Sequence, residues 1–88
     1  MRNEKTLIAF KKANSHIGSI IKMLEEDKYC IDIMQQNLAV IGLLKSAHQQ
    51  LMEAHLNACF KDAMETNNEK KKQEMVQEVL QVTRLYNK

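Results

Sequence analysis

The sequence has no proline and only two glycines, Gly18 and Gly42. Proline and glycine are the residues that most often end helices and form turns, so their scarcity favours long helices. Aromatic residues are also scarce, with two phenylalanines, two tyrosines and no tryptophan, whereas sheet proteins are usually richer in aromatic and β-branched residues. We therefore predict an all-α fold, and the length of 88 residues limits it to a single domain, residues 1–88.

No apolar stretch approaches the roughly 18 residues of a membrane-spanning helix. The first residues, MRNEK, do not resemble a signal peptide. We therefore expect a cytoplasmic protein that does not contact membranes. The sequence shows no acid–base dyad, nucleophile elbow or phosphate-binding loop, so we do not expect an enzyme.

Basic residues are concentrated at the start of the chain. Residues 1–24 contain five basic residues and one acid, a net charge of +4, whereas residues 25–88 contain eight basic and ten acidic residues, a net charge of −2. A basic segment on an acidic body is suited to contact the phosphates of DNA, although a solvated helix face explains the same pattern. The candidate DNA contacts are Lys11, Lys12 and Lys22, followed by His16, Lys5 and Arg2.

Apolar spacing predicts three helices. The first covers residues 4–26, and the acidic run at 25–27 favours its end. The third covers residues 70–86, after a polar loop. The apolar positions of the first helix are Phe10, Ala13, Ile17, Ile20 and Leu24.

The second predicted helix is long, covering residues 27–63 with Asp27 as a candidate N-cap. A continuous helix of about 35 residues would extend about 50 Å. Because this length exceeds the diameter of so small a monomer, a partner chain should cover part of the helix. A bend at Gly42 is the alternative.

Three residues are candidate metal ligands. His55 and Cys59 are four residues apart, which places them on one helix face. Cys30 lies about 37 Å from His55 along a straight helix and cannot join them within one chain. In an antiparallel dimer, Cys30 of one chain meets His55 and Cys59 of the other, and a two-fold axis creates two such sites.

Two thiolates and one imidazole suit Cu(I), which accepts two or three soft ligands. Zn(II) or Ni(II) would bind there with water or a further ligand. In a reducing compartment, metal binding or redox sensing is a better interpretation of two cysteines than a structural disulfide. The simplest alternative is that Cys30 and Cys59 are small buried hydrophobic residues. We interpret His48 as an interface residue rather than a ligand.

Several motifs within residues 20–60 together resemble a known family. They are the acidic turn and Tyr-Cys of EEDKYCIDI, the Ala39-Val40 pair in a glutamine-rich helix, and His55 followed four residues later by Cys59 in HLNAC. This pattern is similar to the copper-sensing (CsoR/RcnR-like) family of transcriptional repressors. The resemblance covers essentially the whole chain.

The resemblance implies a three-helix protomer that dimerises into an antiparallel four-helix bundle and usually pairs again as a dimer of dimers, a homotetramer. It also implies one Cu(I) per protomer, bound between chains by Cys30, His55 and Cys59. Nickel and cobalt sensors of the family have a histidine where Cys59 stands, and persulfide sensors lack the histidine at position 55. Tyr29 and a third-helix glutamate, Glu78 or otherwise Glu74, are the implied hydrogen-bonding partners of the site.

The first helix departs from the family pattern. Where the family has Arg, Gly-Gln and Arg-Gly, this chain has Lys12, Ser15-His16 and Gly18-Ser19. Lysine contacts phosphate without the bidentate geometry of arginine. The operator contacts should therefore differ from those of typical members.

The sequence thus predicts a repressor that binds operator DNA without metal and is released when Cu(I) binds. Two alternatives remain open. One is a thiol- or persulfide-sensing repressor that uses Cys30 and Cys59. The other is a helical adaptor that does not bind DNA.

Overall fold

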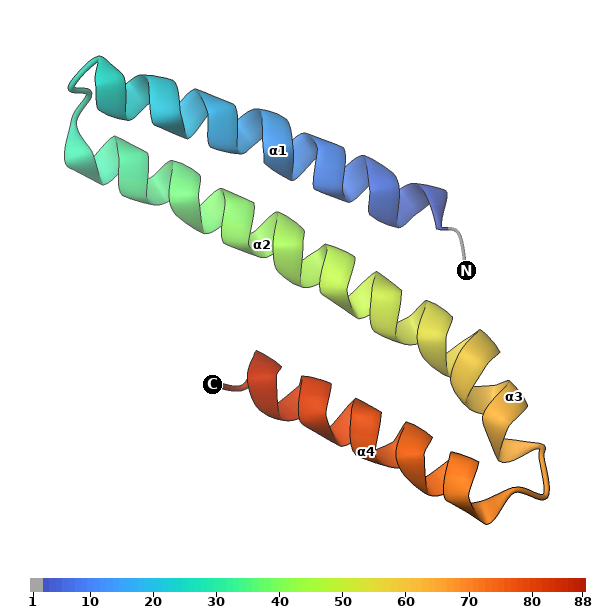
Figure 1. Ribbon diagram of the computed structural model, residues 1–88. Helices are drawn as coiled ribbons and strands as arrows, with labels where there is room; N and C mark the ends of the chain where they lie inside the picture. The colour runs from blue at the N-terminus through green and yellow to red at the C-terminus, as the bar shows by residue number, and fades with distance from the viewer. Residues whose placement is uncertain (1–2) are drawn as a thin grey trace. The chain divides into compact units, whose positions relative to one another are not determined.

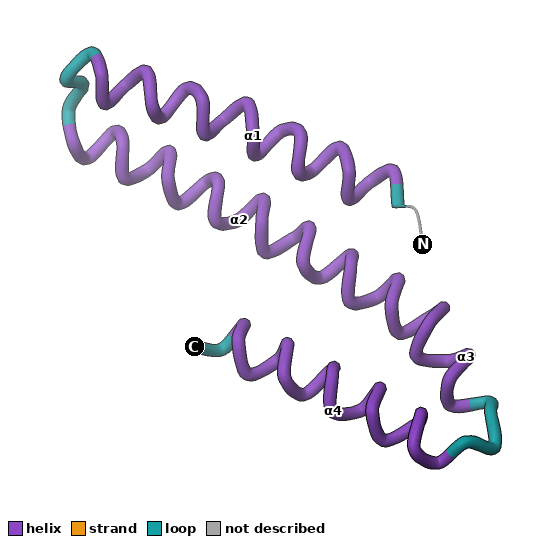
Figure 2. Tube along the Cα trace, viewed as in Figure 1, coloured by secondary structure: helices purple, strands orange, loops and turns teal. Residues whose placement is uncertain are grey.

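The computed structural model describes residues 3–88, and this part of the chain is helical without a strand (Figures 1 and 2). The all-α prediction is confirmed. One compact unit ends at Glu53 and a second begins at Ala54, and each is described by itself. In chain order the elements are α1 (Glu4–Glu25), α2 (Cys30–His55), the π-helical turn η1 (Leu56–Phe60), the short α3 (Lys61–Met64) and α4 (Glu69–Tyr86).

The helix α1 has a defined start and end. The side chain of Asn3 accepts a hydrogen bond from the Thr6 N–H at 3.3 Å, and asparagine is among the preferred N-cap residues. Glu4 lies in the first turn, where the helix dipole favours negative charge. The helix ends at Glu25, within the acidic run that predicted its end.

The turn between α1 and α2 corrects the role predicted for Asp27. Its backbone is left-handed, with φ of 54°. The Asp27 N–H donates to Leu24 O at 3.2 Å and the Lys28 N–H donates to Met23 O at 3.0 Å, which is the Schellman arrangement at a helix C-terminus. Asp27 therefore closes α1 instead of capping the second helix, which begins only at Cys30.

Within the first unit, α1 and α2 lie antiparallel (Figure 1), and the buried side chains of the two helices are small. Ala13, Val40 and Ala47 are buried, and Thr6 is buried with them. The Thr6 hydroxyl donates to Oε1 of Gln50 at 3.2 Å. Short side chains allow two helix backbones to approach closely, so this hairpin is held by close packing and by hydrogen bonds between the helices.

The larger apolar residues of α1 point elsewhere. Phe10, Ile17 and Leu24 are 41%, 42% and 58% exposed, although Ala13 in the same series is buried. The spacing predicted the helix correctly, but this chain alone does not cover its apolar stripe. A similar outward-facing series on α2 consists of Ile31, Met34, Leu38, Ile41 and Leu44.

The long second helix is not one α-helix. It passes Gly42 without interruption, so that glycine does not end the helix. The α-helical hydrogen bonding instead gives way to the π-helical turn η1 at Leu56–Phe60, before α3 resumes at Lys61. The predicted segment 27–63 is therefore three consecutive helical pieces that begin at Cys30 and end at Met64.

The second unit pairs α3 with α4. Ala63 of α3 is buried, and its carbonyl accepts a hydrogen bond from the Thr66 hydroxyl at 2.7 Å in the connecting turn. The side chain of Asn68 caps α4 by accepting from the Lys71 N–H at 3.1 Å. The predicted third helix, residues 70–86, is confirmed as Glu69–Tyr86.

Among the described residues, no helix is both long enough and apolar enough to span a membrane.

Candidate metal centre and nucleic-acid interface

The candidate ligand Cys30 is the first residue of α2 and its thiol is exposed. The turn closed by Asp27 directly precedes it, and the carbonyl of Tyr29 accepts the first hydrogen bond of the helix, from the Ile33 N–H at 3.2 Å. The position of Cys30 therefore depends on how α1 ends. Within one chain, Cys30 is therefore not part of the buried apolar core.

His55 and Cys59 lie where the helix changes type. His55 is the last residue of α2 and is half-buried, whereas Cys59 is in η1 and its thiol is exposed. A π-helical turn closes with an i to i+5 hydrogen bond and so holds more residues than an α-helical turn. Residues four apart remain within about one turn in either geometry, so both side chains leave the same side of the helix.

The three candidate ligands are not assembled within one chain. No three His, Cys, Asp or Glu side chains in residues 3–88 form a group that could hold a metal ion. Cys30 belongs to the unit that ends at Glu53, whereas His55 and Cys59 belong to the unit that begins at Ala54. The sharing of a site between two chains remains a prediction.

The residues expected to support the site are all solvent-facing in this chain. Tyr29 is exposed beside Cys30. Glu74 and Glu78 lie one turn apart on the exposed side of α4 and line a shallow groove with Lys70 and Gln77. The structure therefore presents both glutamates on one face and does not distinguish between them as partners of His55.

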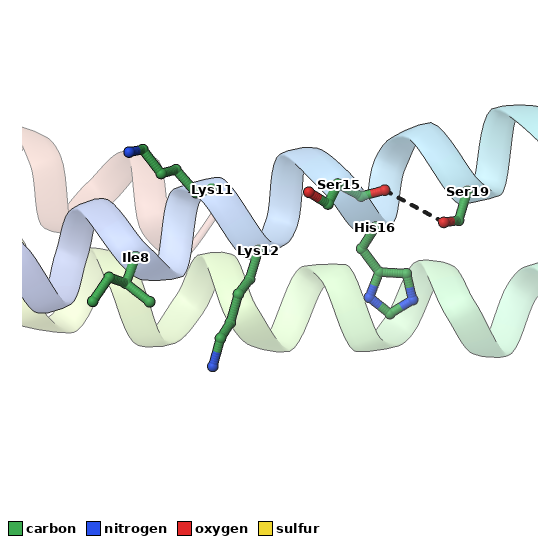
Figure 3. Close-up of a pocket in the computed structure, with 6 residues that line it drawn as sticks. All are labelled: Ile8, Lys11, Lys12, Ser15, His16 and Ser19. Carbon is green, nitrogen blue, oxygen red and sulfur yellow. Dashed lines mark hydrogen bonds between the residues drawn. The ribbon is translucent and has the colours of Figure 1, made fainter.

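The basic side chains of α1 surround a shallow groove (Figure 3). The side chains of Lys12 and His16 extend to one side of the helix, and Lys11 extends to the other. The Ser19 hydroxyl donates to the Ser15 carbonyl at 3.4 Å and is thus partly occupied within the helix. The groove is lined by Ile8, Lys11, Lys12, Ser15, His16 and Ser19.

The remaining candidate DNA contacts lie outside this groove. Lys5 is exposed near the start of α1. Lys22 is exposed and lies 3.9 Å from the Glu26 carboxylate, an ion pair of the kind that contributes little in water and leaves the lysine available. Arg2 lies outside the described residues.

Three features of this surface and site were missed by sequence reasoning. The π-helical turn η1 has no proline or glycine to indicate it. The contacts from α1 to Gln36 and Gln50 join residues that are 20 and 44 positions apart in sequence. Helix periodicity places a residue on a face, but it does not pair two faces with each other.

Comparison with known proteins places these features in a family context. Residues 2–84 match the family described as "Metal-sensitive transcriptional repressor". The copper-sensing transcriptional repressor CsoR of Mycobacterium ulcerans is 38% identical over 63 residues, covering 72% of this chain and 54% of that protein. CsoR of Bacillus subtilis is 30% identical over 78 residues, covering 89% of this chain and 74% of that protein. The matched region is thus about half the length of the mycobacterial relative.

A solved structure resembles the whole chain. The copper-sensing repressor CsoR of Geobacillus thermodenitrificans, crystallised with Cu(I), matches with a TM-score of 0.88 and 27% sequence identity. The match covers 100% of this chain and 93% of that protein. This match extends the similarity of fold over all of the helices described above.

Proposed function

The chain belongs to the metal-sensitive transcriptional repressor family, and we propose that it is a copper-responsive repressor, bound to operator DNA without metal and released when Cu(I) binds. The observation that carries this proposal is the full-length similarity to a CsoR structure that contains Cu(I). The ligand set implied by the family resemblance, Cys30, His55 and Cys59, is complete in this sequence. We propose that residues 1–88 act as one regulatory domain in the cytoplasm, without enzymatic activity.

We propose that Cys30 of one protomer and His55 and Cys59 of its partner hold one Cu(I) per protomer. The chemistry of the donors supports this assignment, because two thiolates with one imidazole match the preference of a soft monovalent ion. Both thiols are exposed and therefore accessible to a second chain. When bound, the ion would supply a bond between two chains that neither chain can form alone.

The outward-facing apolar residues of α1 and α2 support a dimer. The series on each helix recurs every three or four residues, as expected for helices that pack along their length. Burial of one large apolar side chain contributes about 1.5–3 kcal/mol, so burying several of them would strongly favour association. We propose an antiparallel four-helix bundle that pairs further into a tetramer.

The basic face of α1 is the proposed operator-binding surface. Lys11 and Lys12 lie on a groove that also presents hydroxyl groups and an imidazole, and these groups all form hydrogen bonds with phosphate oxygens. Lys22 extends the same charge toward the end of the helix. Lysine contacts with phosphates make affinity strongly dependent on salt.

Release of DNA requires that the metal prefer the DNA-free form of the protein. By thermodynamic reciprocity, DNA then weakens Cu(I) binding by the same factor by which Cu(I) weakens DNA binding. Tyr29 and either Glu78 or Glu74 are the proposed partners that would hold the His55 ring and connect it to the rest of the protomer.

The experiment that tests this proposal measures Cu(I) binding and DNA binding on the same protein sample. Reduced protein is titrated with Cu(I) against a competing chelator, and binding is then measured to a duplex that the apo-protein has selected from random-sequence DNA. We expect tight Cu(I) binding at one ion per chain and a large loss of DNA affinity in the loaded protein. Zn(II) and Ni(II) serve as comparison metals and should release DNA less completely. Cu(I) loading that leaves DNA affinity unchanged would contradict the proposal.

A thiol-sensing repressor is the second candidate, and the exposure of both cysteines favours it. A disulfide or persulfide between Cys30 and Cys59 of two chains would also alter the interface. Treatment of reduced, metal-free protein with a polysulfide, followed by a non-reducing gel and DNA binding, separates the two functions. A copper sensor should keep its DNA affinity under mild treatment, whereas a thiol sensor should form linked dimers and lose it.

A further inference from the structure

His16 connects the basic face of α1 to α2. Its imidazole is half-buried, and its Nε2 is hydrogen-bonded to Oε1 of Gln36 on α2. The ring extends to the same side of α1 as Lys12 (Figure 3). A titratable side chain that is hydrogen-bonded to a neutral amide therefore lies on the same side of α1 as Lys12, on the proposed DNA-binding surface.

Gln36 determines which nitrogen of the ring carries a hydrogen. An amide oxygen can only accept a hydrogen bond, so Nε2 of His16 is the donor whether the ring is neutral or charged. Protonation then changes only Nδ1, which turns from an acceptor into a donor. The ring can thus keep one orientation while its other nitrogen gains the ability to donate to a phosphate oxygen.

We propose that Gln36 is a positioning residue that presents Nδ1 of His16 to the DNA backbone, so that DNA binding is accompanied by protonation of His16 and becomes tighter as pH falls. This inference rests on the proposed function, because it requires DNA on the basic face of α1. It adds a residue of α2 to a binding surface that sequence patterns placed on α1 alone.

Charged residues of both helices lie within about one turn of the His16–Gln36 pair along the sequence. On α1, Lys12 lies one turn before His16 and extends to the same side of the helix, whereas Lys11 extends to the other side. On α2, Asp32 lies one turn before Gln36 and is exposed. Because one lysine and one carboxylate largely offset each other here, the arrival of phosphates is the event that most increases the negative potential at Nδ1.

The direction of the pH effect follows from proton linkage. If the DNA complex binds more protons than the free protein, affinity rises as pH falls, by at most about tenfold per pH unit for each proton taken up. A charged ring that contacts a phosphate also displaces a counterion. The plot of log affinity against log salt should then steepen by about 0.9 for each His16 that is engaged.

The test compares pH 8 with pH 6 in chelator and reductant, so that no metal contributes. Apo-protein is titrated onto the duplex selected from random-sequence DNA, over a range of salt concentrations. We expect wild type to bind at least about threefold more tightly at pH 6, with the steeper salt dependence. His16→Gln should lose both effects and bind as wild type does at pH 8. The control is Asn14→Gln, at an exposed residue of α1 outside the groove, and it should keep both effects.

Two variants test the positioning role of Gln36. Gln36→Leu removes the acceptor and leaves the ring free to turn, so most of the pH effect should disappear. Gln36→Glu keeps an oxygen acceptor but adds a negative charge that favours the protonated ring before DNA binds, so the pH effect should move to higher pH. Nitrogen chemical shifts of the His16 ring in wild type provide a direct measurement, and they should show hydrogen on Nε2 in the neutral form. Because these shifts are measured on wild type, they test the role of Gln36 even if Gln36→Leu fails to fold.

The outcomes separate this inference from the function on which it rests. Wild type that binds the duplex equally at pH 8 and pH 6, or a His16→Gln variant that keeps the full pH effect, overturns the role of His16 and leaves the repressor proposal standing. Hydrogen on Nδ1 in the neutral ring overturns the role of Gln36. A selection that enriches no duplex, with no binding at either pH, overturns both the inference and the proposed function.

Discussion

Thr6 on α1 donates a hydrogen bond from its hydroxyl to Oε1 of Gln50 on α2 at 3.2 Å, and Thr6 is only 4% exposed. This contact joins the first turns of α1 to the later part of α2, far from the connecting turn. It fixes the alignment of the two helices at the open end of the hairpin.

Thr6→Val preserves the shape of the side chain and removes the donor to Gln50. We expect a loss of about 0.5–1.5 kcal/mol in the free energy of unfolding, because a partly buried hydrogen bond is broken. Urea denaturation at one fixed protein concentration measures the change. Thr6→Ser keeps the hydroxyl, so it should retain the hydrogen-bond contribution and lose only a methyl group. If Thr6→Val is as stable as wild type, the hydroxyl contributes nothing to the alignment.

Asp27 is in the left-handed region, with φ of 54°, and its carboxylate lies at the negative end of the α1 dipole. Asp27→Gly removes both the steric strain of the left-handed backbone and the unfavourable negative charge at the end of the helix. It should therefore raise the free energy of unfolding by about 0.5–1 kcal/mol. Asp27→Val should destabilise it by about 1–2 kcal/mol, because a β-branched residue tolerates this conformation poorly. Thermal melts of the two variants give the comparison. Equal melting temperatures of the two variants would mean that the turn rearranges when residue 27 changes.

The basic groove of α1 provides a test of where DNA binds. Replacing both Lys11 and Lys12 with Glu reverses the charge there and should abolish operator binding, while Cu(I) affinity stays nearly unchanged. The matched control replaces Lys70 and Lys71 with Glu, the same charge change on α4. Fluorescence anisotropy with the selected duplex measures both variants. If the α4 variant loses DNA binding and the α1 variant does not, DNA binds at α4 and the proposal that it binds at α1 is wrong.

Copper binding and DNA release should separate at His55. Cys30→Ser or Cys59→Ser should cost most of the Cu(I) affinity, because thiolates are the preferred ligands of this ion. His55→Ala should bind Cu(I) more weakly but measurably, and should lose the coupling to DNA disproportionately, because the second ring nitrogen no longer reaches a partner. The measurement is the ratio of DNA affinities for apo and fully loaded protein. If loaded His55→Ala releases DNA as completely as wild type, His55 is a ligand and nothing more.

Leu38 tests the proposed dimer interface, since its side chain is 64% exposed in the single chain. A glutamate there would place an unpaired charge within a buried apolar seam. We expect Leu38→Glu to shift the protein toward smaller species in sedimentation velocity and to weaken Cu(I) binding with the loss of the shared site. Asn37→Glu adds the same charge at the adjacent position and should leave the assembly intact. An unchanged assembly in Leu38→Glu would remove α2 from the interface.

The helices themselves were predictable, because helix periodicity and capping are local properties of the sequence. The end of α1 near Glu25 and the extent of α4 followed from acidic residues and apolar spacing. The role of Asp27 did not follow, because the same residue type suits an N-cap and a left-handed C-terminal position. Which role it takes depends on how the neighbouring carbonyls are satisfied.

The candidate site was predictable only in part. Residue types and the family resemblance identified Cys30, His55 and Cys59, but the π-helical turn at Leu56–Phe60 has no local signal. The role of Gln36 could not be predicted either, because it depends on the hydrogen bond that Gln36 forms with His16 on the neighbouring helix. The apolar stripe of α1 was recognised, but periodicity does not say whether the same chain or another one covers it.

The buried apolar side chains in residues 3–88 are Ala13, Val40, Ala47 and Ala63, none of them larger than valine. So small a core supplies little of the free energy that offsets chain ordering. Folding and association should therefore be one equilibrium, with a melting temperature that rises with total protein concentration. A cell that makes too little of the protein would then hold a larger fraction of unfolded chains, open to proteolysis. Its abundance would fall more steeply than its rate of synthesis.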